Sequence, residues 1–157
     1  FSRDAVNGMV GQSFGSVAGI ILIVAAGGGF KQTLVDSGIG DVIANSITES
    51  AMNPLIAGWL VAVLIRLATG SATVATVTAS GIMVPLATGM NPTHLALLVL
   101  AIGAGSVFFS HLNDAGFWLV KEYFGMTVGQ TLKTWSLMET ILSVVGLGCV
   151  MLLSLVL

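Results

Sequence analysis

Charge is what this sequence lacks most. Its 157 residues include only five Lys or Arg and seven Asp or Glu, whereas 55% are hydrophobic and the mean hydropathy is +1.02. A water-soluble domain needs charged and polar groups over most of its surface, and twelve charged residues cannot cover a domain of this size. The composition therefore excludes an ordinary soluble domain and predicts a protein whose solvent is the lipid bilayer.

Other absences narrow the function. No run of Lys or Arg exists and the net charge is −2, which excludes a nucleic-acid partner. Cys149 is the single cysteine, so we expect a small buried apolar residue and neither a disulfide nor a cysteine-based metal site. Soluble-enzyme signatures such as G-x-S-x-G and H-E-x-x-H are missing, and we predict no catalytic residues, metal or cofactor. The chain opens without Met or a basic n-region, so we expect an internal piece of a longer protein.

The long apolar segments predict an all-α, polytopic transmembrane helix bundle. Residues 5–29 carry no charge and are long enough to cross the hydrocarbon core. Residues 134–157 are also long enough to do so. Residues 31–50 mix apolar positions with three acidic residues, which favours short amphipathic helices along the interface. Residues 121–133 are interpreted as a polar loop.

Residues 52–87 are apolar for more than one span but are interrupted at residues 66–73. Each arm is too short to cross the bilayer alone at 1.5 Å per residue. Either this segment is one long broken helix, or it is a re-entrant hairpin with its polar tip near the membrane centre. Irregular backbone at that depth is tolerated only where it faces protein or a watery cavity, so the break predicts a cavity.

Residues 94–120 form a second interrupted segment, which we predict to be a discontinuous helix. Transporters use paired breaks of this kind to hold a polar solute near the midplane, because the freed N–H groups at the start of a half-helix favour a carboxylate. The predicted substrate-binding residues are Arg66, Thr69, Gly70, Ser71, Thr73 and Thr76 in the first break, and Gly105, Ser106, Ser110 and Asn113 in the second. Two alternatives stay open: the hydroxyls satisfy neighbouring carbonyls, and Arg66 pairs with an acid or snorkels.

His111 and Asp114 are candidates for proton coupling. They lie three residues apart, so on a helical turn they share a face, and a buried Asp and a His both titrate within reach of physiological pH. The alternatives are a structural histidine bonded to a carbonyl and an aspartate that caps a helix starting near Ala115.

Several motifs in order resemble the C-terminal region of the gluconate permease family of bacterial proton symporters. They are RLATGSATVA at 66–75, AGSV at 104–107, SHLND at 110–114, GFW at 116–118, TVGQTLKTW at 127–135 and MET at 138–140, together with GGGF at 27–30 and DSGIGD at 36–41. The resemblance implies a multi-pass inner-membrane symporter of the wider ion-transporter superfamily, and it favours the re-entrant hairpin over 52–87. It further implies that this chain is roughly the second half of a transport domain.

The partners implied are gluconate or a related hydroxy acid, protons, membrane lipid, the remainder of the full-length transporter and, as an open option, further copies of the protein. Two other functions remain open. One is a D-serine-type amino-acid symporter of the same family, and the other is a non-transporting membrane module that serves as an assembly subunit or sensor.

Overall fold

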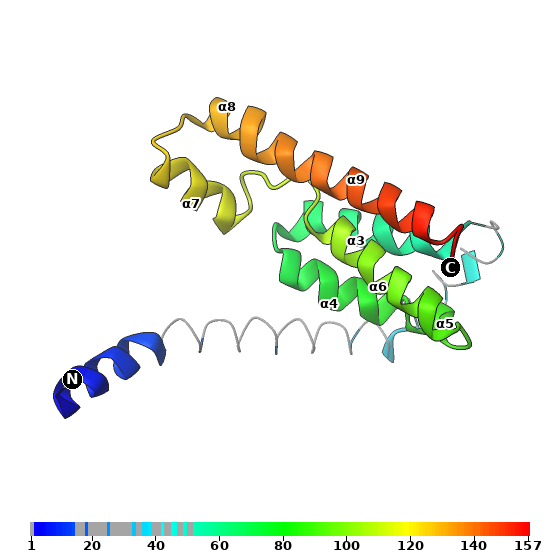
Figure 1. Ribbon diagram of the computed structural model, residues 1–157, viewed down its shortest axis with the longest axis horizontal. Coiled ribbons are helices and arrows are strands. Elements are labelled where there is room, and N and C mark those ends of the chain that lie inside the picture. Colours follow the sequence, from blue (N-terminus) through cyan, green and yellow to red (C-terminus); the bar gives the residue numbers. More distant parts are fainter. Residues whose placement is uncertain are drawn as a thin grey trace.

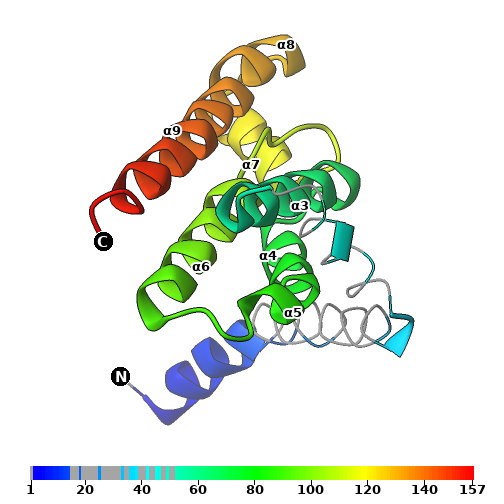
Figure 2. The same ribbon diagram turned by 90° about the vertical axis from the view of Figure 1, so that its right-hand side faces the viewer.

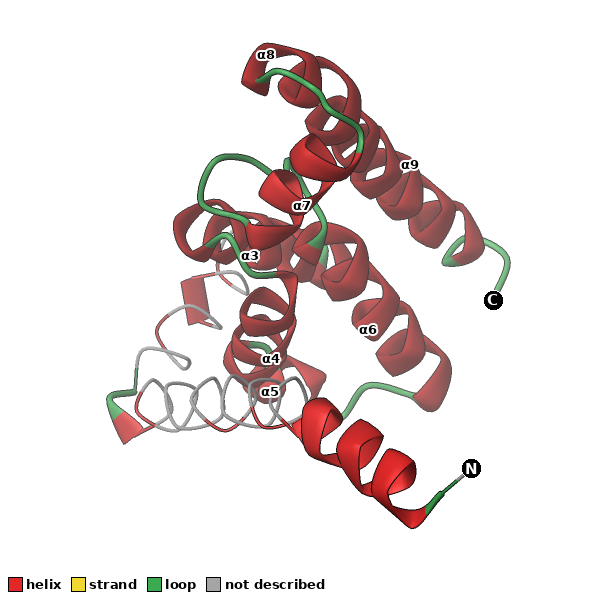
Figure 3. Ribbon diagram, turned by 90° about the vertical axis from the view of Figure 1, so that its left-hand side faces the viewer, coloured by secondary structure: helices red, strands yellow, loops and turns green. Residues whose placement is uncertain are grey.

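The computed structural model describes residues 2–14 and 52–157, and between them only residues 18, 25, 33, 36–38, 42, 45, 46 and 49. Its regular structure over these residues is helical, without a strand, which confirms the all-α class (Figure 3). Residues 3–14 form a helix and cover the start of the predicted span 5–29. The rest of that span, and most of the predicted interfacial segment 31–50, lie outside the described residues.

The first interrupted segment folds into two short helices. Helix α3 (Pro54–Thr69) starts at Asn53, whose side chain accepts the N–H of Leu55 at 2.9 Å. Helix α4 (Ala72–Ile82) starts at Ser71, whose hydroxyl accepts the N–H of Val74. Only residues 70 and 71 separate the helices, and α3 and α4 lie side by side in opposite directions (Figure 1). The chain therefore reverses direction at residues 70 and 71.

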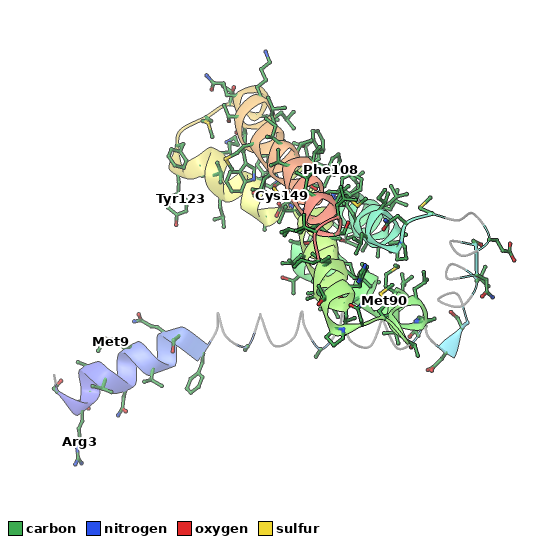
Figure 4. All side chains as sticks on the ribbon, turned by 45° about the vertical axis from the view of Figure 1, so that its right-hand side comes forward. Arg3, Met9, Met90, Phe108, Tyr123 and Cys149 are labelled. Atoms are coloured by element: carbon green, nitrogen blue, oxygen red, sulfur yellow. The ribbon has the colours of Figure 1, made fainter. Side chains whose placement is uncertain are left out.

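The second interrupted segment also contains two helices. After the short helix α5 (Val84–Ala87), helix α6 (Pro92–Ser106) starts at an Asn91 cap and helix α7 (Ala115–Tyr123) starts at an Asp114 cap. Residues 107–114 separate α6 from α7 and contain no regular helix. Helix α7 leaves the bundle and packs against the helix that follows it, and Tyr123 at its end points away from the bundle (Figure 4).

The last three elements form one continuous helical segment. Helix α8 (Val128–Thr131), a π-helical turn η1 (Leu132–Ser136) and helix α9 (Leu137–Leu153) together make 26 residues, long and apolar enough to cross a membrane. The helix begins at Val128, six residues before the predicted start of the span at residue 134. A capping box between Thr127 and Gln130 supplies the earlier start, so the predicted polar loop 121–133 is much shorter.

Helices α3, α6 and α9 pack together around a core of small and branched apolar residues (Figure 2). Gly105 lets α6 approach α3, because a Cβ there would lie 2.9 Å from the Cβ of Ala62. The outer side of α9 is apolar and exposed, as expected of a helix that faces lipid; its exposed residues include Leu137, Met138, Ile141, Leu142, Val144 and Val145. Cys149 also is exposed on α9, so the prediction that it is buried is wrong (Figure 4).

Candidate functional site

The two helix breaks meet in space, although more than 40 residues separate them in the chain. The side-chain amide of Asn113 donates to the carbonyl oxygen of Leu67 at 3.0 Å, and His111 Nε2 lies 3.3 Å from the same oxygen. Gly70 packs directly on Asn113, since a Cβ on Gly70 would lie 2.6 Å from the carbonyl carbon of Asn113. The polar tip of the α3–α4 hairpin is therefore in contact with the polar loop between α6 and α7.

A buried ion pair between Arg66 and Asp114 joins the two breaks. The Arg66 residue is 3% exposed, and its guanidinium contacts the Asp114 carboxylate with one terminal nitrogen and donates to the carbonyl oxygen of Gly70 with the other. The predicted alternative in which Arg66 pairs with an acid is thus the one observed. Arg66 occupies the last turn of α3 and Asp114 caps the start of α7, so each charge also lies at the helix end that favours it.

Arg66 keeps one donor unused. Its Nε is buried and has no hydrogen-bond partner among the described residues. Leaving a buried donor of a charged group unpaired is costly, and such groups in native structures usually meet water or a ligand. The guanidinium is therefore equipped to accept a further partner beside Asp114 and Gly70.

Asp114 accepts bonds from three different elements. Its carboxylate accepts the N–H of Gly116 at 2.8 Å, the hydroxyl of Ser110, and the guanidinium of Arg66. The capping role, predicted as an alternative to proton coupling, is present in the structure. The same carboxylate is also the anionic half of the ion pair, so any change in its charge acts on both breaks at once.

Ser110 anchors the second break to the last helix. Its hydroxyl accepts the indole N–H of Trp135 at 2.9 Å while donating to Asp114, and its carbonyl oxygen accepts the hydroxyl of Ser136. Trp135 and Ser136 both belong to the π-helical turn η1. Such turns are common at functional sites because the wider turn displaces the side chains beside it.

Backbone strain is also located in this break. Phe109 adopts φ +43°, a conformation that costs a residue other than glycine free energy, and its ring lies 5.7 Å from the His111 ring. The preceding residue, Phe108, packs edge-on against Trp59 of α3. Contacts on both sides therefore hold the strained residue in place.

The other predicted binding residues divide into three groups. Three hydroxyls bond within their own helix, namely Thr69 to Ile65, Thr76 to Ala72 and Ser106 to Gly103, each at 2.8–2.9 Å. Gly105 serves helix packing and Ser71 caps α4. Thr73, in the first turn of α4, is exposed beside the break.

Sequence reasoning missed a polar stripe on the last helix. Ser136, Glu139, Thr140 and Ser143 recur at intervals of three and four, so they share one face of η1 and α9. Ser143 accepts the indole N–H of Trp59 at 3.0 Å, which shows that this face packs toward α3. The spacing within SLMETILS was the available signal, and Glu139 is the charged member of the stripe.

Comparison with known proteins identifies relatives along the whole chain. The model of the GntP family permease matches residues 1–156. A gluconate permease of Pseudomonas aeruginosa is 55% identical over 157 residues, which are all of this chain and 35% of that protein. The Gnt-II system L-idonate transporter of Escherichia coli is 51% identical over 146 residues, covering 92% of this chain and 33% of that protein.

A gluconate permease of Bacillus subtilis is 51% identical over 137 residues, which cover 87% of this chain and 30% of that protein. The chain thus spans about a third of the length of the curated relatives it matches. No solved structure matches it.

Proposed function

This chain belongs to the GntP family of permeases, and we propose that it forms the C-terminal part of a secondary transporter carrying gluconate or a related small hydroxy-carboxylate with protons. The transporter would be a multi-pass protein of the bacterial inner membrane. The observation that carries the proposal is the contact between two helix breaks, joined by a buried guanidinium that retains an unpaired donor.

The arrangement suits a polar solute in lipid. Helices α3 and α4 have 16 and 11 residues, about 24 and 17 Å at 1.5 Å per residue, which is short of a hydrocarbon core of about 30 Å. A hairpin of this length enters and leaves on the same side, so we place its tip at residues 70–71 inside the membrane. Irregular backbone there requires protein or water around it, and a transport site provides both.

The substrate carboxylate is proposed to bind at Arg66 and at the start of α4. Arg66 offers its unpaired Nε–H, and the first turn of α4 offers backbone N–H groups beside the exposed Thr73. The hydroxyls of Thr69, Ser71, Thr73 and Thr76 from the first break, with Ser106, Ser110 and Asn113 from the second, are the proposed partners for the substrate hydroxyls. Gly70 and Gly105 provide the close backbone approaches that bring these groups together.

Proton coupling is proposed to act through exchange of the partner of Arg66. When Asp114 binds a proton it loses its charge, and Arg66 is left with a buried positive charge that an incoming carboxylate neutralises. Proton and anion therefore favour each other's binding. His111, which contacts Leu67 across the same junction, is proposed to relay the proton.

Uptake by the full-length protein in proteoliposomes tests the function. An inward proton gradient should drive accumulation of labelled gluconate, and unlabelled gluconate, L-idonate and D-serine as competitors would rank the substrates. Asp114→Asn should lower the accumulation ratio, while Glu122→Gln, which changes an exposed carboxylate, should leave it unchanged. Absence of uptake with every hydroxy acid would favour the non-transporting module, and full accumulation by the Asn variant would remove Asp114 as a proton carrier.

A further inference from the structure

Glu139 is a carboxylate within the helix that is long enough to cross the membrane, and it has no role in the proposed transport site. It is half-buried on α9, between exposed Met138 and exposed Ile141 on the outer side. It forms no hydrogen bond or ion pair with the residues that the structure describes. An ionisable side chain in a membrane-spanning helix is costly and points to a function.

Contacts on either side direct Glu139 toward the site. One turn before it, Ser136 donates to the carbonyl oxygen of Ser110 in the second break; one turn after it, Ser143 accepts from Trp59 on α3. Glu139 lies between these two residues on the same face of the helix, the face that contacts the second break and α3. The carboxylate is therefore on the side of α9 that faces the junction of the breaks, where Arg66 and Asp114 form their ion pair.

The other titratable groups on the elements packed against α9 are exposed or bonded elsewhere, which leaves Arg66 and Asp114 as the charged pair on the side that Glu139 faces. The elements packed against α9 carry Arg66 on α3, His94 on α6 and Lys133 on η1, and the break carries His111 and Asp114. His94 bonds Asn91 at the opposite end of α6, Lys133 is exposed, and His111 contacts Leu67. Arg66, Asp114 and Glu139 together have a net charge of −1 when all three are ionised, and only Asp114 pairs directly with Arg66 among them.

We propose that Glu139 binds a second proton in the transport cycle, which rests on the proposed function and deepens it. An anion entering a cluster of charge −1 is repelled. One proton on each carboxylate leaves only the charge of Arg66, which the substrate carboxylate then neutralises. Both protons come from the outer solution and are released inside with the substrate, so each anion travels with two protons and the cycle carries one net positive charge inward.

The wild-type protein tests this stoichiometry directly. With two protons, a gradient of one pH unit at zero potential supports an accumulation ratio of about 100, against about 10 with one proton. A potential of 100 mV, inside negative, without a pH gradient should support about 50-fold accumulation with two protons and none with one. Potassium-loaded proteoliposomes with valinomycin provide the second condition. Accumulation by pH but not by potential would overturn the proposal.

Substitution assigns the second proton to this side chain. Glu139→Gln should still take up gluconate with a pH gradient, but its ratio should fall about tenfold per pH unit and its response to potential should vanish. Glu139→Asp should restore both responses, and the exposed Glu122→Gln should retain them. If Glu139→Gln fails to fold, as judged by gel filtration and thermal unfolding, two other measurements decide the proposal. They are the potential-driven uptake by Glu139→Asp and the size of that uptake in the wild type.

The failures are distinguishable. Absence of gluconate uptake by the wild type under any gradient rejects the proposed function itself. Uptake by the wild type with unchanged potential dependence in folded Glu139→Gln rejects only the role of Glu139.

Discussion

The two helix breaks that meet in this protein are built by different means. The first uses two residues, Gly70 and Ser71, and is held by backbone geometry: Gly70 has φ +70° and the Ser71 hydroxyl caps the next helix. The second uses eight residues, 107–114, and is held by side chains that reach α3, α7 and η1. One break is a short turn, and the other is a network.

This difference suggests a division of roles. The first break presents groups whose charge is fixed, namely an arginine and the N–H groups of a helix start. The second presents a histidine and a carboxylate, His111 and Asp114, whose charge depends on bound protons. We infer that the first break binds the anion, and that the second makes its binding depend on protons. Four measurements test that division.

The largest effect should come from the ion pair that joins the breaks. Asp114→Leu leaves the buried charge of Arg66 unpaired, and Arg66→Leu leaves the half-buried charge of Asp114 unpaired. Each should lower the free energy of unfolding, by about 3–5 kcal/mol for Asp114→Leu and by less for Arg66→Leu. The double variant should cost less than the sum of the two, because it removes both charges. Unfolding of the full-length protein in detergent measures each value.

The exposed pair of Lys121 and Glu122 is the control. Its carboxylate is 72% exposed, so Lys121→Leu should change stability by less than about 1 kcal/mol. Additive losses of stability in the Arg66 and Asp114 variants would show that the ion pair does not couple the two breaks. The proposed division of roles between the breaks would then have no structural basis.

Gly70→Ala should have the next largest effect. Alanine in the left-handed region costs about 1–2 kcal/mol, and here its Cβ would also press on the backbone of Asn113. Gly125→Ala is a matched control, since Gly125 has φ +61° but no atom within 4 Å of an added Cβ. The excess loss for Gly70 over Gly125 measures the contact between the breaks, expected at about 1–3 kcal/mol. Equal losses would mean that the second break moves aside freely.

The same contrast explains what the sequence could predict. The first break was readable because a glycine and a capping serine interrupt an apolar run, which is a local signal. The second was located by its polar residues, but the alternatives for Asp114 and Arg66 stayed open because their pairing spans 48 positions. Only the folded arrangement brings them together.

For the last helix, the sequence interpretation missed the start of the helix although its signal is local. Its start at Val128 was marked locally by the Thr127 and Gln130 capping box, yet the polar composition around Lys133 concealed it. The role of Glu139 was hidden for a non-local reason, since its spacing from Ser136 and Ser143 gains meaning only when both contact other helices.

Ser110→Ala should destabilise the second break moderately. The change leaves the half-buried indole N–H of Trp135 without its acceptor and removes one donor to Asp114, a loss of about 1–3 kcal/mol. Ser106→Ala is the control, because that buried hydroxyl bonds only a carbonyl of its own helix and should cost less than about 1 kcal/mol. Fluorescence of the indole gives a second readout. Equal losses for the two serines would argue against a side-chain network in this break.

The smallest effect on stability, and the most selective for function, is expected for Thr73→Val. The hydroxyl is exposed in the first turn of α4, so unfolding should change by less than about 0.5 kcal/mol. If the first break binds the anion, loss of one substrate hydrogen bond should raise KM for gluconate about tenfold, since such a bond contributes about 1–1.5 kcal/mol. The accumulation ratio at a fixed pH gradient should not change, because the number of protons sets it. Thr88→Val, exposed beyond the far end of α4, should alter neither quantity. A change in the ratio for Thr73→Val would place coupling in the first break as well, and the division of roles between the two breaks would fail.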